Sequence, residues 1–396
     1  MNKNILNFLN TITDTITVNK LLVTSFLKHK NICIIVNQKI SNLTISQNHK
    51  EYKLLKEFDL ILQNENQKLC FEELLELFEF VISPSDKLVN GAIYTPKNIR
   101  NYITNQSFSE LNNKFLETVK IADIACGCGG FLIDASNELH RRTGKPFKKI
   151  FQENIFGVDI QKYSIERTEI LLSLLAITEN ENEEEFSFNI YQGDSLKYDW
   201  KDTKFDMILG NPPYVCSRNM NDETKKSMKE WSTCRTGHPD LYIPFFQIGY
   251  ELLKDDGILG YITVNSFINS VNGRAIREYF EQQKVLLKIV DFGDEQIFRS
   301  RMTYTCLCFI QKSCNGSILY TQKKSNILKA LKKTKFIEEK YEDLDSFKSW
   351  NLKNNTFIKE VESREKTFGK IYDTKSGIAT LKNHVYIFKP IDQNEE

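Results

Sequence analysis

The fold is decided by the stretch Ile121-Ala-Asp123-Ile-Ala-Cys126-Gly127-Cys128-Gly129-Gly130-Phe131 in this chain of 396 residues. The stretch follows an apolar run and opens an amphipathic pattern over 130–141, which is typical of a buried strand that leads into a helix. Its glycines let the backbone turn sharply and come close to a ligand. The sequence therefore predicts a strand, a ligand-binding turn and a helix in direct succession.

The same alternation of apolar runs and helical patterns extends over residues 89–315. Strands are predicted at Val119–Ile124, Ile155–Val158, Phe188–Tyr191, Phe205–Leu209, Ile258–Val264, Leu286–Val290 and Tyr304–Ile310, and helices near 130–141, 161–176, 241–253 and 273–283. Such alternation favours an α/β fold with a mostly parallel, doubly wound sheet of seven strands. Ligands of such sheets lie at the carboxyl ends of the strands.

The flanking regions 1–88 and 316–396 differ from this central domain. The first is expected to be mainly helical, with a helix at Phe71–Phe80 and one strand at Asn31–Val36. Between 311 and 340, eight lysines accompany two glutamates, a local charge of 8 − 2 = +6. A solvated helix face and a track along a phosphate backbone explain this excess about equally well.

Composition excludes several classes of protein. The 53 Lys and Arg nearly cancel the 52 Asp and Glu, so a uniformly basic nucleic-acid coat is excluded, and 41% hydrophobic residues exclude wholesale disorder. Nine scattered cysteines suit free thiols in a reducing compartment. The sequence has no signal-peptide pattern and no apolar run of the roughly 18 to 20 residues that span a bilayer, so we expect a cytoplasmic protein.

Three acidic residues end three successive predicted strands. Asp123 precedes the glycine turn, Asp159 ends Gly157-Val158-Asp159, and Asp194 lies in Gly193-Asp194-Ser195. A carboxylate at the second position accepts both hydroxyls of a ribose, and one at the third accepts from an adenine amine. With no phosphate-binding loop in the chain, the set predicts a nucleoside cofactor without a pyrophosphate. Singly, each acid also fits a strand-terminal turn, and Cys126-x-Cys128 lacks a second pair at zinc-site spacing.

The motif that points to chemistry is Phe205-Asp-Met-Ile-Leu-Gly-Asn211-Pro212-Pro213-Tyr214, an apolar strand that runs into four distinctive residues. Two prolines fix the backbone and leave rigid carbonyl acceptors. An Asn amide oxygen beside the Pro212 carbonyl holds the two N–H bonds of a planar amino group while its nitrogen attacks an electrophile. Tyr214 offers a flat face on which a base stacks.

In this order, the motifs resemble those of S-adenosylmethionine-dependent DNA methyltransferases. Within these enzymes, they resemble the gamma class, which methylates adenine N6 in TaqI-type, Type IIG and Type I restriction–modification systems. Gly91-Ala-Ile-Tyr94-Thr95-Pro96 looks like their motif X, and Asp291–Phe298 followed by Thr303–Ile310 looks like motif VIII and the last β-hairpin. The resemblance covers about 90–312. It implies a Rossmann-like methyltransferase fold of seven strands with a C-terminal β-hairpin.

The resemblance also implies residue roles. Thr95 would contact the methionine end of the cofactor, Ile160 would pack on its adenine, and Tyr214 and Phe298 would sandwich a base flipped out of double-stranded DNA. The cofactor-binding set is Tyr94, Thr95, Asp123, Ala125, Gly127, Gly129, Phe131, Asp159, Ile160, Asp194, Ser195 and Asn211, the catalytic set is Asn211, Pro212, Pro213 and Tyr214, and no metal is expected. His238 is interpreted as loop structure, and no Pro-Cys nucleophile of the cytosine-C5 type is present.

The C-terminus departs from the family pattern. Gly377-Ile-Ala-Thr380-Leu-Lys-Asn383 looks like the opening of a target-recognition region, so 316–396 is interpreted as a basic linker and the start of that region. Specificity is therefore expected to come partly from a partner subunit or from the second half of a split enzyme. Two alternatives remain, a protein-glutamine or ribosomal RNA N-methyltransferase and a cofactor-holding module that only supports a partner.

Overall fold

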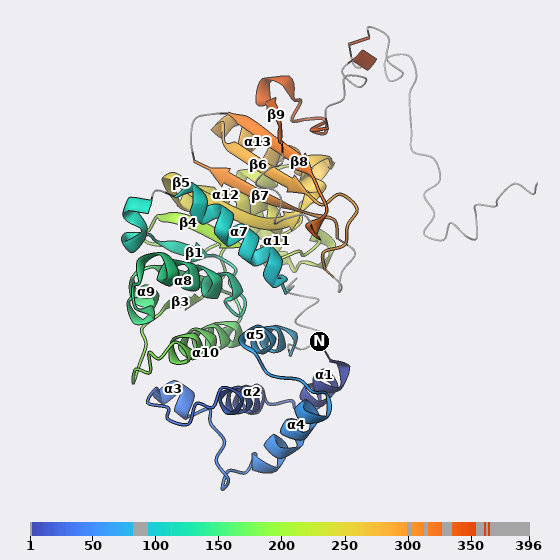
Figure 1. Cartoon of the computed structure of the whole chain (residues 1–396). Helices are drawn as coiled ribbons and strands as arrows, with labels where there is room; N and C mark the ends of the chain where they lie inside the picture. The colour runs from blue at the N-terminus through green and yellow to red at the C-terminus, as the bar shows by residue number, and fades with distance from the viewer. Residues whose placement is uncertain are drawn as a thin grey trace, which may run out of the picture. The chain divides into compact units, whose positions relative to one another are not determined.

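A single mixed sheet organises the part of the chain that this computed structural model describes, which is residues 2–81, 94–111, 113–298, 303–312, 316–326, 335–353, 360–361 and 363–364. The sheet has nine strands in the order β3-β2-β1-β4-β5-β7-β6-β8-β9 (Figure 1). Their bounds are β1 Ile121–Asp123, β2 Ile155–Asp159, β3 Asn189–Gln192, β4 Phe205–Gly210, β5 Leu253–Val264, β6 Leu286–Asp291, β7 Thr305–Gln311, β8 Ser317–Gln322 and β9 Ile337–Lys340. The chain divides into two compact units, 1–352 and 353–396.

The seven predicted strands are confirmed as β1 to β7. Strands β1 to β5 pair in parallel with their neighbours, whereas β7 runs antiparallel between β5 and β6. This order reverses direction between β1 and β4, so the carboxyl ends of these two strands border a crevice in which ligands of doubly wound sheets bind. The Rossmann-like fold with a C-terminal antiparallel pair is therefore correct.

The predicted number of seven strands is wrong, because β8 and β9 extend the sheet beyond β6. Strand β8 pairs in parallel with β6, and β9 pairs antiparallel with β8. Ile318 and Tyr320 are buried against the sheet. The apolar residues of β8 lie inside the lysine-rich stretch 311–340. The charge of that stretch suggests a basic linker and hides the strand pattern.

Helices cover both faces of the sheet. Helices α7 Lys97–Glu110 and α8 Gly130–Thr143 lie on one face, and α12 Tyr242–Leu252 and α13 Arg274–Gln283 on the other (Figure 1). The remaining helices of the central region are α9 Phe147–Glu153, α10 Lys162–Thr178 and α11 Asp222–Met228. Within the described residues, no helix is long and apolar enough to cross a membrane.

The N-terminal region is helical, as predicted, but the expected strand at 31–36 is absent. Its helices are α1 Lys3–Asn10, α2 Thr15–His29, α3 Gln38–Ser41, α4 Tyr52–Asn64 and α5 Phe71–Phe80. The segment around Ile34 instead binds the Asn182 side chain, which accepts from Val36 N at 3.0 Å and donates to Ile34 O at 2.8 Å. Ile34 is 77% exposed, so its apolar side chain marks no buried strand.

The N-terminal region packs directly on the central domain through α5 and α10. Arg167 of α10 is 1% exposed, and its guanidinium donates to Phe78 O at 2.7 Å and to Asn19 Oδ1 at 3.3 Å. A buried charge is tolerated only when its donors are satisfied, so these bonds fix α5 against the sheet domain. Helix α5 is thereby held beside the glycine turn after β1.

Candidate cofactor and target site

A cavity of about 520 Å³ lies at the carboxyl ends of β1, β2, β3 and β4. The predicted residues that line it are Tyr94, Thr95, Ala125, Gly127, Asp159, Ile160, Asp194, Ser195, Asn211 and Pro213. Residues from five separate stretches of the sequence thus come together around one space. Asp123, Gly129, Phe131, Pro212, Tyr214 and Phe298 are not among the lining residues.

The glycine turn after β1 forms one wall, and two carboxylates hold its backbone. Gly127 N donates to Asp159 Oδ2 at 2.9 Å, and Cys128 N donates to Glu79 Oε1 at 2.9 Å. Gly129 has a φ of +83°, and a Cβ there would lie 2.7 Å from the Thr168 side chain. The position therefore requires glycine for both its conformation and its packing.

Asp159 is half-buried in this wall and accepts hydrogen bonds from the backbone of two segments. Its second oxygen accepts from Gln161 N at 2.8 Å. Burial raises the pKa of Asp159, and these backbone hydrogen bonds oppose that rise. Each carboxylate oxygen has two acceptor sites, so Asp159 retains the capacity to accept hydroxyls from a ligand in the cavity.

Asp123 supports the turn from beneath instead of facing the cavity. Its side chain is 2% exposed and accepts from Ala125 N at 3.0 Å. Burial raises the pKa of Asp123 to about 8. Gly210 leaves room for this carboxyl, because a Cβ there would approach Asp123 Oδ1 to 2.9 Å.

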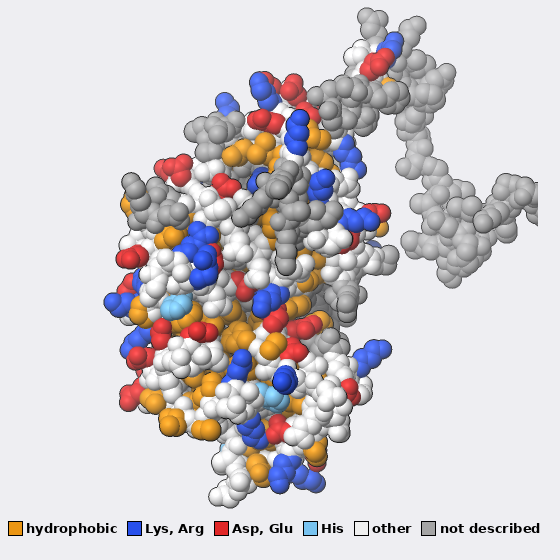
Figure 2. Space-filling view, viewed as in Figure 1, with side chains coloured by type: hydrophobic (Ala, Val, Ile, Leu, Met, Phe, Trp, Pro, Cys, Tyr) orange, Lys and Arg blue, Asp and Glu red, His pale blue; other side chains and the backbone are white. Residues whose placement is uncertain are grey.

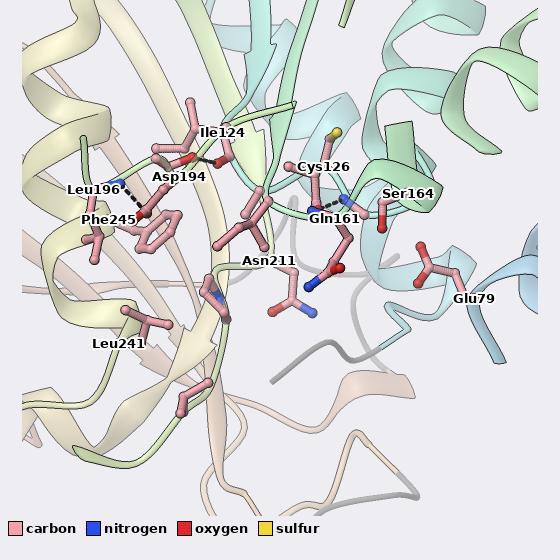
Figure 3. Close-up of a pocket in the computed structure, with 18 of the residues that line it drawn as sticks. Glu79, Ile124, Cys126, Gln161, Ser164, Asp194, Leu196, Asn211, Leu241 and Phe245 are labelled. Atoms are coloured by element: carbon pink, nitrogen blue, oxygen red, sulfur yellow. Dashed lines mark hydrogen bonds between the residues drawn. The ribbon is translucent and has the colours of Figure 1, made fainter. Parts of the chain in front are cut away.

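The end of β3 forms the opposite wall. Asp194 Oδ1 accepts from Leu196 N at 3.0 Å, and the Ser195 hydroxyl donates to Ile124 O (Figure 3). Ile160, which directly follows β2, is 53% exposed and lines the cavity. An exposed aliphatic side chain between two carboxylates suits a flat base that is held at its edges by hydrogen bonds.

Asn211 is oriented by a chain of hydrogen bonds that begins at a buried arginine. Its Nδ2 donates to Thr95 Oγ1 at 3.0 Å, and Thr95 O accepts from Arg100 Nη1 at 2.8 Å. Arg100 is 2% exposed and is paired with Glu72 and Asp134, each at 2.9 Å. Because its nitrogen points to Thr95, the amide of Asn211 directs its oxygen to the other side.

The two predicted stacking residues lie next to each other. The ring centroids of Tyr214 and Phe298 are 6.0 Å apart with planes at 64°, and Tyr214 also contacts Tyr242 edge to face. Tyr214 Oη donates to Ile262 O at 3.1 Å, and both predicted rings are at least 95% buried. In this arrangement the rings fill the space between them, so a base can stack there only after they separate.

Several predicted features lie partly or wholly outside the described residues. Residues 91–93 of the motif X segment and the Gly377–Asn383 stretch are outside them, as are three of the eight lysines between 311 and 340. His238 is described, is exposed, and donates its backbone N–H to Asn272 Oδ1 at 3.0 Å. It lies in a loop and is not among the lining residues of the cavity, and its structural role stays a prediction.

Two charged residues that line the cavity, Glu79 and Arg100, are among those that the sequence did not indicate. Glu79 belongs to α5, and Glu72 of the same helix pairs with Arg100 and accepts from the Tyr94 hydroxyl. Glu72 and Glu79 are seven residues apart and lie on one face of the helix. The helix has four glutamates, at positions 72, 73, 76 and 79, so no local signal in the sequence distinguishes Glu79.

Comparisons with known proteins agree on the class of protein. Residues 153–298 match the family described as Eco57I restriction-modification methylase. The chain is 26% identical over 386 residues to the Type II restriction enzyme and methyltransferase RM.Eco57I of Escherichia coli, which covers 80% of this chain and 38% of that protein. It is 23% identical to the adenine-specific methyltransferase PglX of Streptomyces coelicolor over 53% of this chain and 22% of that one.

Solved structures agree on the fold. The structure of a DrdV–DNA complex superposes with a TM-score of 0.62 at 16% identity, over 85% of this chain and 41% of that chain. The present chain therefore spans well under half the length of these relatives.

Proposed function

From the match of residues 153–298 to the Eco57I restriction-modification methylase family, we propose that the chain is a DNA adenine-N6 methyltransferase. It would transfer a methyl group from S-adenosylmethionine to the exocyclic amine of a flipped-out adenine, in a restriction–modification or related host-defence system. The observation that carries the proposal is the oriented Asn211 amide, which borders the same cavity as Asp159 and Asp194. The name of the PglX relative supports adenine as the base.

The described residues fit S-adenosylmethionine as the cofactor. Asp194 and Asp159 would hold the adenine amine and the ribose hydroxyls, and Ile160 would pack on the adenine ring. Carboxylates line the cavity and no phosphate-binding loop is present, which suits a cationic nucleoside. When bound, this cofactor supplies an electrophilic methyl group.

The chain's own groups would act by positioning. The Asn211 amide oxygen and the Pro212 carbonyl accept the two N–H bonds of the target amine, and the Pro212-Pro213 pair holds that carbonyl rigid. The two oxygens also stabilise the positive charge that develops on the amine nitrogen. Holding the nitrogen in line with the methyl group lowers the barrier without a general base.

Double-stranded DNA is the proposed partner, and the cytoplasm is the proposed compartment. Figure 2 shows Lys and Arg interspersed with Asp and Glu on the face drawn, which agrees with the net charge of +1. A mixed surface supplies limited non-specific attraction to phosphates. The E. coli relative, of which this chain covers 38%, is named both restriction enzyme and methyltransferase. Because this mixed surface supplies little attraction of its own, we propose that a specificity subunit, or the second half of a split enzyme, contributes to target recognition.

The test is transfer of tritiated methyl from S-adenosylmethionine to unmethylated genomic DNA, followed by nucleoside analysis. We expect label in N6-methyladenine, either with the chain alone or after addition of a subunit that co-purifies with it. Label that accumulates in RNA or protein in preference to DNA would contradict the proposal. Label in N4-methylcytosine would contradict its choice of base.

A further inference from the structure

Helix α5 brings a half-buried carboxylate into the cavity, and none of the roles above uses it. Glu79 lines the cavity, and its Oε1 accepts from Cys128 N at 2.9 Å. A Cβ at Gly127 would lie 3.1 Å from Oε1 and 3.8 Å from Oε2, so the whole carboxyl group lies against the glycine turn. One backbone N–H occupies only part of the acceptor capacity of a carboxylate.

The order of the strands indicates which end of a cofactor faces Glu79. Along the sheet, β3, β2 and β1 are neighbours, so Asp194, Asp159 and the glycine turn follow one another across the cavity. In Figure 3, Asp194 and Glu79 lie on opposite sides of the cavity with Asn211 between them. If adenine is at Asp194 and ribose at Asp159, the amino-acid end of the cofactor lies toward the turn and Glu79.

We propose that Glu79 binds the ammonium group at the amino-acid end of the cofactor, an assignment that rests on the proposed function. A buried carboxylate is costly unless a cation or donors compensate it, and an ammonium provides both a charge and N–H donors. Burial raises the pKa of Glu79 and nearby Asp159 adds to that rise, although the Cys128 N–H bond and the charges of Arg167 and Arg100 oppose it. A bound ammonium would therefore stabilise the ionised form of Glu79, which burial disfavours.

A purely structural role for Glu79 makes a different prediction. If Glu79 only anchors the turn through Cys128 N, then Glu79→Gln keeps the acceptor oxygen and leaves cofactor affinity unchanged. If Glu79 binds the ammonium, the same substitution removes the charge and weakens every ligand that carries this group. The substitution thus separates the two roles with little change in shape.

The experiment is isothermal titration calorimetry of the full chain with three ligands. S-adenosylmethionine has a sulfonium and an ammonium, S-adenosylhomocysteine has the ammonium alone, and 5′-methylthioadenosine has neither. For E79Q we expect about 10- to 100-fold weaker binding of the first two and less than about 3-fold change for the third. The control is Glu57→Gln, which removes one negative charge from an exposed position of α4 and should alter none of the affinities.

Three results would overturn the proposal. Unchanged affinities in E79Q would limit Glu79 to support of the turn, and equal loss for all three ligands would assign it to the nucleoside or to the shape of the cavity. Loss for S-adenosylmethionine alone would assign it to the sulfonium. A wild-type chain that binds none of the three would contradict the proposed function itself and, with it, this assignment.

A second measurement needs no variant and therefore does not depend on whether E79Q folds. The wild-type chain should bind a desamino analogue of S-adenosylhomocysteine about 10- to 100-fold more weakly than S-adenosylhomocysteine. Equal affinity for the two compounds would overturn the proposal.

Discussion

The two ends of the candidate site differ in how completely they are formed. At the cofactor end, Asp159 and Glu79 already hold the backbone of the glycine turn around an open cavity of about 520 Å³. At the target-base end, Tyr214 and Phe298 contact each other edge to face and are buried. Under the proposed roles, the difference predicts a preformed site for the cofactor and a separation of the two rings before a flipped base can stack.

Asn211 connects the two ends, so its removal should have the largest effect. For Asn211→Ala we expect methyl transfer to fall by at least roughly 100- to 1000-fold, because one of the two acceptors of the target amine is lost. Affinity for S-adenosylmethionine should change by less than about 3-fold. Single-turnover transfer and equilibrium binding measure the two quantities.

The control for this substitution is Asn48→Ala, which changes the same residue type at an exposed position. It should leave both quantities unaltered. Wild-type rates of transfer in Asn211→Ala would show that the amide takes no part in the reaction.

Thr95 tests how the two ends of the site are connected, because its hydroxyl orients the Asn211 amide from the cofactor side. Thr95→Val should lower kcat roughly 10- to 100-fold through loss of that orientation, and Thr95→Ser should restore most of it. The measurement is kcat and the KM for S-adenosylmethionine in all three proteins. A change confined to KM would mean that Thr95 contacts the cofactor and does not orient Asn211.

Substitution of Phe298 tests the target-base end without altering the cofactor end. Loss of one stacking face in Phe298→Ala should weaken binding of DNA with a mismatched, easily flipped target base by about 1–3 kcal/mol. Affinity for S-adenosylmethionine should stay at the wild-type value, because Phe298 is not among the lining residues of the cavity. Fluorescence of 2-aminopurine at the target position follows base flipping directly, and an unchanged signal would remove Phe298 from this role.

At the cofactor end, the buried Asp123 should make the stability of the fold depend on pH. Burial raises the pKa of Asp123 to about 8. Because this pKa lies above that of the unfolded chain, folding favours the protonated acid, an advantage that is present below about pH 4 and lost as pH rises to about 8. Asp123→Asn keeps the acceptor for Ala125 N and does not ionise, so its Tm should exceed that of the wild type by a margin that grows as pH rises from about 4 to about 8.

The matched control for this titration is Asp202→Asn, which lies in an exposed turn. Its Tm should follow the wild type at every pH. A parallel course of the Asp123→Asn and wild-type curves would contradict a buried, protonated Asp123.

Strand ends were predictable from the sequence, whereas contacts between distant helices were not. Periodicity and glycine positions suffice to predict β1 to β7 and to bring Asp159, Asp194 and Asn211 to one edge of the sheet. The contribution of Glu79 depends on how α5 packs beside the glycine turn, 49 residues away in the chain. Local patterns contain no information on such packing until the fold is known.

The two wrong strand predictions, at 31–36 and at β8, have the same physical cause. The expected strand at 31–36 has the right composition but finds no neighbouring strand, since the Asn182 side chain takes its hydrogen bonds. Strand β8 is flanked by lysines that suggest a linker, and it forms because β6 offers a free edge with which it pairs. In both cases the partner in space, and not the residue type, decides the structure.

The account is tested most directly by loading the wild-type chain with methyl-labelled S-adenosylmethionine in the absence of DNA, removing free cofactor, and then adding unmethylated DNA. We predict that label remains with the protein before DNA is added and then appears in N6-methyladenine. Failure to retain label without DNA would contradict a preformed cofactor end. Transfer of retained label to any acceptor other than the adenine amine would contradict the assigned reaction.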